Sequence, residues 1–484
     1  MTAIVDFLNT VLWGYVLVYG LLAVGVYFTW RTGFLQFRHF PEFFRVVKSS
    51  RDTSAAGISP FQALTISLAS RVGTGNLAGV AVAIYLGGPG AVFWMWMVAL
   101  VGMATAYAES TLAQLYKVRN ADGQYRGGPA FYMSRGIGSN AMGYVFSVCL
   151  IISFGLIFSA VQANSISVAM EEAFSIPKLA TGLVVGGVAG VVIFGGIKSI
   201  ARVAEKIVPA MAGLYILVAL FIVVTNIADV PAMLALIVKS AFGFEAAAGG
   251  FTGGFMAALL NGVKRGLFSN EAGMGSAPNI AAVAVPDPHH PSSQGLVQGL
   301  GVFIDTLVIC TATALMILLS GLVDYSEGAA TGMALTQIAL EHHIGAFGPI
   351  FVGVAILFFA FTSIIGNYSY AENAMEFLGM GRRIPLFVLK IFVVAMVVWG
   401  SLQAVTTVFN FADASMALMA TVNLIAILIL SKTVAKLTRD YFAQRRAGKE
   451  PIFKVSEYSE LGDGVDQSIW NSDVAREKRA AHLE

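Results

Sequence analysis

The stretch SRVGTGNLAG, residues 70–79, interrupts an apolar run that is long enough to cross a bilayer as one helix. Apolar segments flank it on both sides, FQALTISLA before it and VAVAIYL after it. The interruption itself contains glycines, a threonine, an asparagine and an arginine. Glycine costs a helix about 1 kcal/mol relative to alanine, and a charged side chain in the middle of a membrane span is unfavourable. We therefore expect the helix over 60–86 to be broken near its centre.

The composition of the chain is that of an all-α polytopic membrane protein. Of its 484 residues, 57% are hydrophobic and only 12% are charged, whereas about 25% of the residues in a soluble domain are charged. The net charge of +2 gives no reason to expect a nucleic-acid partner. Cys149 and Cys310 both lie in apolar runs, so we expect neither a disulfide nor a metal site. The N-terminal MTAIVDFLNT lacks the basic residues of a signal peptide, so the first span is expected to remain.

Eleven candidate spans divide the chain, and the positions of Lys and Arg predict their orientation. The spans lie near residues 9–30, 60–86, 90–116, 142–170, 179–197, 207–226, 251–284, 296–321, 347–376, 384–401 and 405–431. If the N-terminus is outside, nearly all Lys and Arg of the connecting segments fall on the inner side, and only Lys178 and Lys239 fall on the outer side. Cytoplasmic loops carry the excess of positive residues. We expect a cell-membrane protein with an outer N-terminus and a cytoplasmic C-terminus.

A second interrupted stretch, GVKRGLFSNEAGMGSAPN, covers residues 262–279. Its glycines and proline predict a broken helix over 251–284. Five spans begin between the first break and the second, and this odd number means that the second broken helix enters the membrane from the opposite face. Such a pair of interrupted helices in two inverted halves is a sequence pointer to the binding site of a transporter.

The repeat divides the chain into four parts. The expected parts are an extra N-terminal transmembrane helix with a cytoplasmic interfacial segment (1–59), the first five-helix repeat (60–226), the second, inverted repeat (227–431) and a polar cytoplasmic tail (432–484). The interfacial segment could equally be an ordinary connecting loop. The last thirty residues are polar and patternless, so little structure is expected there.

Broken helices in a membrane suggest a binding site because lipid does not tolerate unpaired backbone polar groups. The N-terminus of a half-helix suits a carboxylate, and freed carbonyls suit a hard cation. A small amino acid with an alkali cation would match both. The alternative is that the glycines only allow close helix packing, but packing does not account for Asn76, Glu271 and Pro278.

The two interrupted regions, SRVGTGNLAGVAVAIYLGGPGAVFWMWMVALVGMATAYAESTLAQLYK and GVKRGLFSNEAGMGSAPN, resemble the signatures of the alanine or glycine:cation symporter family. The resemblance extends over the second to the eleventh span. It implies a LeuT-like fold with five plus five helices in inverted repeat. It also implies sodium-coupled uptake of a small neutral amino acid, alanine or glycine first, by a functional monomer. A proton-coupled amino acid porter is the alternative, and no cofactor beyond the coupling ion is expected.

The resemblance also implies where a sodium ion lies. The matching positions are Ala69 and Val72, which would offer backbone carbonyls, and Thr362 and Ser363, which would offer hydroxyl groups. From the residues alone, the two hydroxyl groups could instead bond back to the preceding helical turn, as they often do in membrane helices.

The two breaks supply most of the predicted substrate positions, and the resemblance implies a further contact near Gln162. The first break would hold the carboxylate through its amides, and the second would receive the ammonium group. Many members of the family carry a tryptophan where this chain has Asn367, and this departure leaves the pocket shape open. The predicted substrate-binding residues are Gly73, Thr74, Gly75, Asn76, Gln162, Gly273, Met274, Gly275 and Asn367.

Charged residues inside spans are usually paired. Arg71 and Asp305 lie at similar depths from the same face, so they could pair beneath the site as part of an inner gate, or form a static structural pair. The roles of five other charged residues stay open: Glu109, Lys264, Arg265, Glu271 and Asp413. No histidine lies in a span, but the carboxylates leave proton coupling possible.

Other classes of membrane protein are less well supported. The chain has no filter-like repeat that would indicate a channel. It also lacks a His/Cys metal cluster, a G-x-S-x-G motif and an H-E-x-x-H motif, so we do not expect an enzyme.

Overall fold

The computed structural model describes residues 2–49, 57–121, 123–243, 250–458, 461 and 464–470. Within this part of the chain, eight helical segments are long and apolar enough to cross a membrane: Val5–Arg31, Gly90–Leu115, Asn140–Phe174, Lys198–Thr225, Pro291–Leu319, Phe347–Phe377, Arg383–Leu402 and Val405–Ile429. The shorter apolar helix at Lys178–Phe194 and the two broken helices account for the other predicted spans. The prediction of a helical polytopic membrane fold is confirmed.

The elements up to the end of the first repeat are α1 (Thr2–Leu8), η1 (Asn9–Leu17), α2 (Val18–Arg31), α3 (Leu35–Arg38), α4 (Phe40–Ser49), α5 (Pro60–Arg71), η2 (Gly75–Gly79), α6 (Val80–Gly87), α7 (Gly90–Leu115), β1 (Val118–Arg119), β2 (Tyr125–Arg126), α8 (Pro129–Arg135), α9 (Asn140–Leu150), η3 (Ile151–Phe158), α10 (Ser159–Phe174), α11 (Lys178–Phe194) and α12 (Ile197–Thr225). The strands β1 and β2 form a short antiparallel hairpin.

The remaining elements are α13 (Val230–Ala241), α14 (Gly250–Asn270), α15 (Pro278–Val283), α16 (Pro291–Val302), η4 (Phe303–Cys310), α17 (Thr311–Leu319), α18 (Gly332–Ile344), α19 (Phe347–Phe377), α20 (Arg383–Leu402), α21 (Val405–Ile429), α22 (Ser431–Arg446) and η5 (Val455–Glu457). The segments η1 to η4 are π-helical, with wider turns than an α-helix.

The first broken helix starts and stops on clear local signals. At the start of α5, the Ser59 and Gln62 side chains form a reciprocal capping box, and Pro60 occupies the first turn. The helix ends at Arg71, because Val72 adopts an extended backbone with φ −75° and ψ 95°. The chain becomes helical again at η2, so the break coincides with the glycine-rich stretch that predicted it.

The second broken helix changes direction through left-handed backbone. After the end of α14, Glu271, Gly273 and Gly275 have φ values of 58°, 86° and 83°. Left-handed values are routine for glycine but uncommon for a glutamate. Pro278 then begins α15. The two broken helices pack together, with η2 against α14 and α15 against α5.

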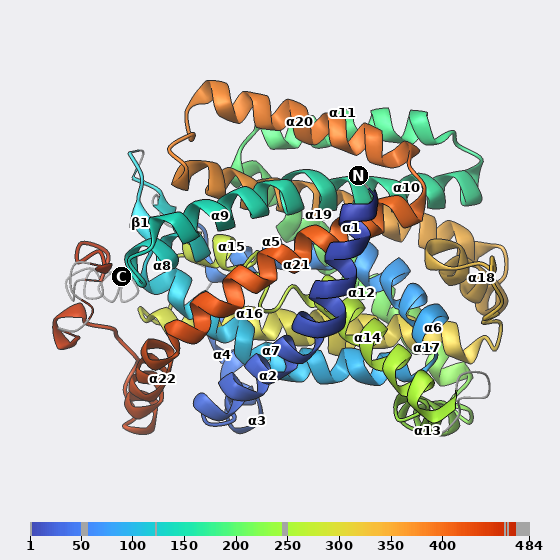
Figure 1. The fold of residues 1–484 in the computed structure, drawn as a ribbon, viewed down its shortest axis with the longest axis horizontal. Helices are drawn as coiled ribbons and strands as arrows, with labels where there is room; N and C mark the ends of the chain where they lie inside the picture. Colours follow the sequence, from blue (N-terminus) through green and yellow to red (C-terminus); the bar gives the residue numbers. More distant parts are fainter. Residues whose placement is uncertain are drawn as a thin grey trace.

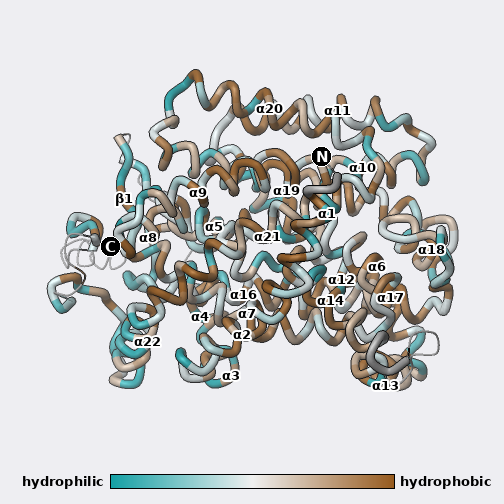
Figure 2. Tube along the Cα trace, in the orientation of Figure 1, coloured by the Kyte–Doolittle hydropathy of each residue, from teal (hydrophilic) through white to brown (hydrophobic). Residues whose placement is uncertain are grey.

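The other helices form layers around these two (Figure 1). Helices α11 and α20 lie side by side along one edge, and α10 and α19 lie next to them. On the other side, α7 packs against α14 and α16. The helices α8 and α22 lie at one end of the bundle, and α13 and α18 lie at the other (Figure 1). Figure 2 shows hydrophobic residues along the spans and hydrophilic residues gathered at α22 and near β1.

The structure departs from the expectation of little order after residue 454. Trp470 is buried, and its indole N–H donates a hydrogen bond to the Leu115 carbonyl at 3.2 Å. The ring also packs against His289 and Phe453. A few apolar residues thus dock the polar C-terminal segment onto the end of α7. Residues 471–484 lie outside the described part.

Candidate substrate and cation site

The first break presents two backbone amides that side chains of the protein already engage. The Gly73 amide donates to Asn76 Oδ1 at 3.0 Å, and the Thr74 amide donates to Gln162 Oε1 at 3.0 Å. Gln162 comes from α10, so the break and a neighbouring span are linked here. Gly75 lies closely against the backbone of Ser269. The amide groups predicted for a carboxylate are therefore buried and face acceptors.

Three of the four residues implied for sodium meet at one point. The Ser363 hydroxyl lies 2.7 Å from the Ala69 carbonyl oxygen and 3.4 Å from that of Val72. It also lies 3.0 Å from the Phe359 carbonyl on its own helix. The Thr362 hydroxyl instead donates to Phe359 O at 2.9 Å. The structure thus brings Ser363 to the first break and turns the Thr362 hydroxyl back to its own helix.

Asn76 is the centre of a polar network that joins both breaks to η4. Its amide nitrogen lies 2.7 Å from Asp305 Oδ1, 3.2 Å from Ser269 Oγ and 3.3 Å from Cys310 Sγ. Asp305 also accepts hydrogen bonds from the hydroxyl groups of Ser269 and Thr306. All five side chains are buried. Asp305 is therefore held by neutral donors.

The structure does not form the predicted pair of Arg71 with Asp305. Arg71 Nη1 donates to the Gln298 carbonyl at 3.3 Å, and no ion pair joins Arg71 to a carboxylate among the described residues. The sequence placed the two residues at similar depths in their spans, but Asp305 lies on a π-helical turn where its carboxylate contacts Asn76. A gate made by direct contact of these two residues is not what the structure shows.

Glu271 ties the second break to the first. Its carboxylate accepts from the Ser70 hydroxyl at 2.9 Å and from the Ser276 hydroxyl at 2.5 Å. Asn367 Oδ1 lies 2.6 Å from the same Ser70 hydroxyl. Asn367 therefore reaches the predicted site through Ser70, one residue from Ala69, whose carbonyl the resemblance implies for sodium.

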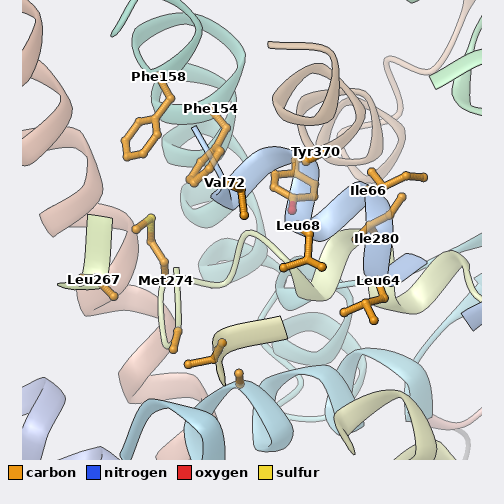
Figure 3. Close-up of a cluster of buried hydrophobic side chains, with 14 of the residues drawn as sticks. Leu64, Ile66, Leu68, Val72, Phe154, Phe158, Leu267, Met274, Ile280 and Tyr370 are labelled. Atoms are coloured by element: carbon orange, nitrogen blue, oxygen red, sulfur yellow. The ribbon is translucent and has the colours of Figure 1, made fainter. Parts of the chain in front are cut away.

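The glycines of the second break also have partners. The Gly273 amide donates to Glu109 Oε1 at 3.2 Å, and Asn423 Nδ2 donates to the Gly273 carbonyl at 3.0 Å. Gly275 packs against Asn423, where a β-carbon would lie 2.9 Å from its side chain. Met274 belongs to the buried apolar cluster shown in Figure 3, which also contains Val72 of the first break. The polar backbone of this break is thus bound to α7 and α21.

An aromatic stack lies beside the breaks. Phe268, two residues before the end of α14, stacks on Phe158 with ring centroids 4.8 Å apart and on Phe409 at 5.4 Å. Figure 3 shows Phe158 and Phe154 projecting from the same segment, η3. Stacked rings therefore join η3 of the first repeat to α14 and α21 of the second repeat.

A cluster of buried charges lies next to this aromatic stack, and the sequence left the roles of its residues open. Both Asp413 carboxylate oxygens lie within 2.7 Å of Arg265 Nη2, and Lys264 Nζ lies 2.6 Å from Oδ2. The Trp13 indole donates to the Asp413 carbonyl at 3.1 Å. The first span, which stands outside the repeat, is thus bonded to this ion cluster.

Three π-helical segments carry residues of the site. They are η2 with Asn76, η3 with Phe158 and η4 with Asp305. π-Helical turns are rare and often mark functional sites. A hydrophobic pattern does not distinguish them from an α-helix, so the sequence could not place them.

Comparisons with known proteins identify the family of the chain. A sequence model of the sodium:alanine symporter family matches residues 1–455. A Bacillus subtilis protein named "probable sodium/glutamine symporter" is 50% identical over 451 residues, covering 93% of this chain and 92% of the relative. An amino-acid carrier protein of Bacillus subtilis is 50% identical over 443 residues, covering 92% of each.

A solved structure shares the fold. The manganese transporter of Eremococcus coleocola has a TM-score of 0.52 at 13% identity, covering 86% of this chain and 90% of that one. At this identity the likeness bears on the fold alone, and it agrees with a LeuT-like helical transporter. The chain is a multi-pass membrane carrier for an amino acid and a cation rather than an enzyme. It belongs to the sodium:alanine symporter family.

Proposed function

We propose that this protein takes up a small neutral amino acid, alanine or glycine first, together with sodium, by alternating access and as a monomer. The observation that carries this proposal is the approach of Ser363 Oγ to the carbonyl oxygens of Ala69 and Val72. Carbonyls released by a break in a membrane helix are typical ligands of a coupling sodium ion. The carbonyl of Val72 is released because the helix ends at Arg71.

The site also supports a small substrate. The amides of Gly73 and Thr74 face side-chain oxygens that a substrate carboxylate could replace. A β-carbon added to Gly73 would lie 2.5 Å from Ser363 Oγ and 2.6 Å from Gln162 Oε1, so little free space surrounds the break. The distribution of Lys and Arg favours an outer N-terminus and a cytoplasmic C-terminus in the cell membrane.

Uptake into proteoliposomes tests this proposal. We expect an inward sodium gradient to drive uptake of labelled alanine, and a potassium gradient of the same size to have no effect. Unlabelled alanine and glycine should compete more strongly than glutamine, the substrate in the name of one relative. Equal uptake without sodium would refute sodium coupling, and stronger competition by glutamine would refute the substrate assignment.

A proton-coupled porter is the second candidate, because buried carboxylates hold both breaks. Glu271 binds the hydroxyl groups of Ser70 and Ser276, and Glu109 binds the Gly273 amide. In neither case is a cation the hydrogen-bonding partner, so either carboxyl group could carry a proton. An inward pH gradient in sodium-free vesicles decides between the two: we expect no uptake, and uptake there would favour proton coupling.

Replacing Ser363 by alanine should weaken the response to sodium. The change removes the hydroxyl group that meets the two carbonyls of the first break, and one such interaction is worth about 1 kcal/mol or slightly more. We therefore expect Ser363→Ala to raise the sodium concentration for half-maximal uptake about tenfold. Thr362→Ala should have a smaller effect, because the Thr362 hydroxyl is directed to Phe359 O.

Ser369→Ala is the matched control for this measurement. Ser369 is buried on the same helix, and its hydroxyl donates only to the Gly366 carbonyl, at 2.6 Å. Its sodium dependence should equal that of the parent. If Ser363→Ala behaved like this control, the cation would not lie at Ser363.

A further inference from the structure

A basic pocket lies apart from the transport site, between the end of α2, the α3 segment and α22. Its volume is about 380 Å³. The end of α2 belongs to the first span, and α22 follows the last span, so both ends of the membrane domain contribute. The charged and aromatic residues of the lining are Trp30, Arg31, Arg38, His39, Arg439, Phe442 and Arg446.

The four arginines of this pocket have no acceptor among the described residues. No hydrogen bond or ion pair engages their guanidinium groups there, and the Arg31 Nε is buried without a partner. The nearby acids are occupied elsewhere. Glu42 pairs with Arg445 at 2.7 Å and accepts from Tyr441, and Asp440 lies 3.2 Å from His290. Within the described part of the chain, the positive charge of the pocket is therefore not compensated by an acidic side chain.

The imidazole ring of His39 lines the pocket together with Phe442. Its ring stacks on Phe442 with centroids 3.9 Å apart and an interplanar angle of 19°. Burial, followed by the charge of Arg446, holds the pKa of His39 below its ordinary value, against the opposing effect of Glu42. The imidazole is thus neutral at neutral pH, and the positive charge of the pocket comes from the arginines.

Exposed aromatic residues at the pocket indicate contact with lipid. Trp30, which lines the pocket at the end of the first span, is 63% exposed. Phe34 and Phe37 follow on the adjoining segment and are 45% and 59% exposed. Aromatic side chains gather at the level of the lipid headgroups, and arginines beside a span attract anionic headgroups. Guanidinium groups bind phosphate oxygens through paired hydrogen bonds.

We propose that this pocket binds the phosphate-bearing headgroup of an anionic phospholipid. The arginines would hold the phosphate, and the exposed rings would lie against the glycerol and the upper acyl chains. A soluble phosphate ester shares the phosphate chemistry but could not use the rings. The aromatic rim is therefore what favours the lipid.

Native mass spectrometry of the delipidated full-length protein in detergent tests the proposal. The three probes are phosphatidylglycerol, phosphatidylcholine and glycerol 3-phosphate. We expect saturable binding of phosphatidylglycerol, with phosphatidylcholine and glycerol 3-phosphate at least tenfold weaker. Arg439→Gln/Arg446→Gln should weaken phosphatidylglycerol binding about tenfold or more, because two charges near the headgroup are lost.

Arg382→Gln/Arg383→Gln is the matched control, because it removes two adjacent arginines at the start of α20, outside this pocket. Its affinity for phosphatidylglycerol should equal that of the parent. Arg38→Gln, at an exposed position, gives the same test should the double variant fold poorly, and it should bind severalfold more weakly. Equal binding of the two lipids, an equal loss in the control, or glycerol 3-phosphate binding as tight as that of phosphatidylglycerol would overturn the proposal.

Discussion

Gly73→Ala should lower sodium-driven amino acid uptake by about ten- to a hundredfold. The new β-carbon would lie 2.5 Å from Ser363 Oγ and 2.6 Å from Gln162 Oε1, closer than atoms in contact can come. Overpacking a well-packed interior costs about 1–3 kcal/mol, or about five- to 150-fold in an equilibrium constant, and the expected loss lies within this range. To relieve this clash, either Ser363 would have to leave the carbonyls of Ala69 and Val72, or Gln162 would have to leave the Thr74 amide. Initial rates at equal protein content in the vesicles measure the effect.

Gly79→Ala is the matched control for that variant. Gly79 lies in the same broken helix and is also buried, but a β-carbon there would have the Thr74 carbonyl oxygen as its only near neighbour, at 3.7 Å. This is an ordinary contact, so uptake should remain close to that of the parent. If Gly73→Ala and Gly79→Ala transported equally well, the close approach of Ser363 and Gln162 to the break would not matter for transport.

Asp413→Ala should destabilise the protein by about 3–5 kcal/mol, because removing one member of a buried ion cluster leaves the other charges without a partner. Arg265 and Lys264 both lie within 2.7 Å of this carboxylate, and the side chains of Asp413 and Arg265 are only 3% and 4% exposed. The hydrogen bond from the Trp13 indole to the backbone carbonyl of residue 413 should survive, because alanine keeps that carbonyl. Equilibrium unfolding in detergent measures the loss of stability, and uptake by the remaining folded protein measures the effect on transport.

Glu171→Ala provides the comparison for the ion cluster. Glu171 pairs with Lys178 at 3.2 Å, but the two side chains are 48% and 34% exposed. Exposed ion pairs contribute about 0–1 kcal/mol, so this variant should unfold almost like the parent. If Asp413→Ala lost as little stability as Glu171→Ala, Arg265 and Lys264 would have to be paired with other groups or with water.

The helical breaks were predictable because their cause is local. Clusters of glycine with polar residues and proline weaken a helix locally, and the breaks after Arg71 and Asn270 lie inside the predicted stretches. The folded part of the C-terminal segment was not predictable. Its overall polarity hides single anchors such as Trp470, whose partners near Leu115 lie far away in the sequence.

The part of the candidate site that could be predicted is the part that the family resemblance named. The resemblance named Ala69, Val72 and Ser363, and the structure brings these three together. Depth along a span also placed Arg71 and Asp305 at one level. Depth does not say which side of a helix a residue faces, and the π-helical turn of η4 directs Asp305 to Asn76 instead.

Charged partners on distant spans could not be matched from the sequence. Arg265 and Asp413 are 148 residues apart, and no local pattern connects them. Both were recognisable as charges inside spans, which indicates that each needs a partner. Only the packing of α14 against α21 identifies that partner.

The contacts of Gln162 and Asn76 with the first break affect how the unloaded carrier returns to its outward-facing state. A buried amide without an acceptor costs about 1–3 kcal/mol. The side-chain oxygens of these two residues occupy the amides of Thr74 and Gly73, so an unloaded carrier can change its facing without leaving either amide unpaired. At the substrate site proposed above, an arriving carboxylate would gain only the difference between a charged and a neutral acceptor. These contacts would therefore make the conformational change of the empty carrier easier and would lower its affinity for the substrate.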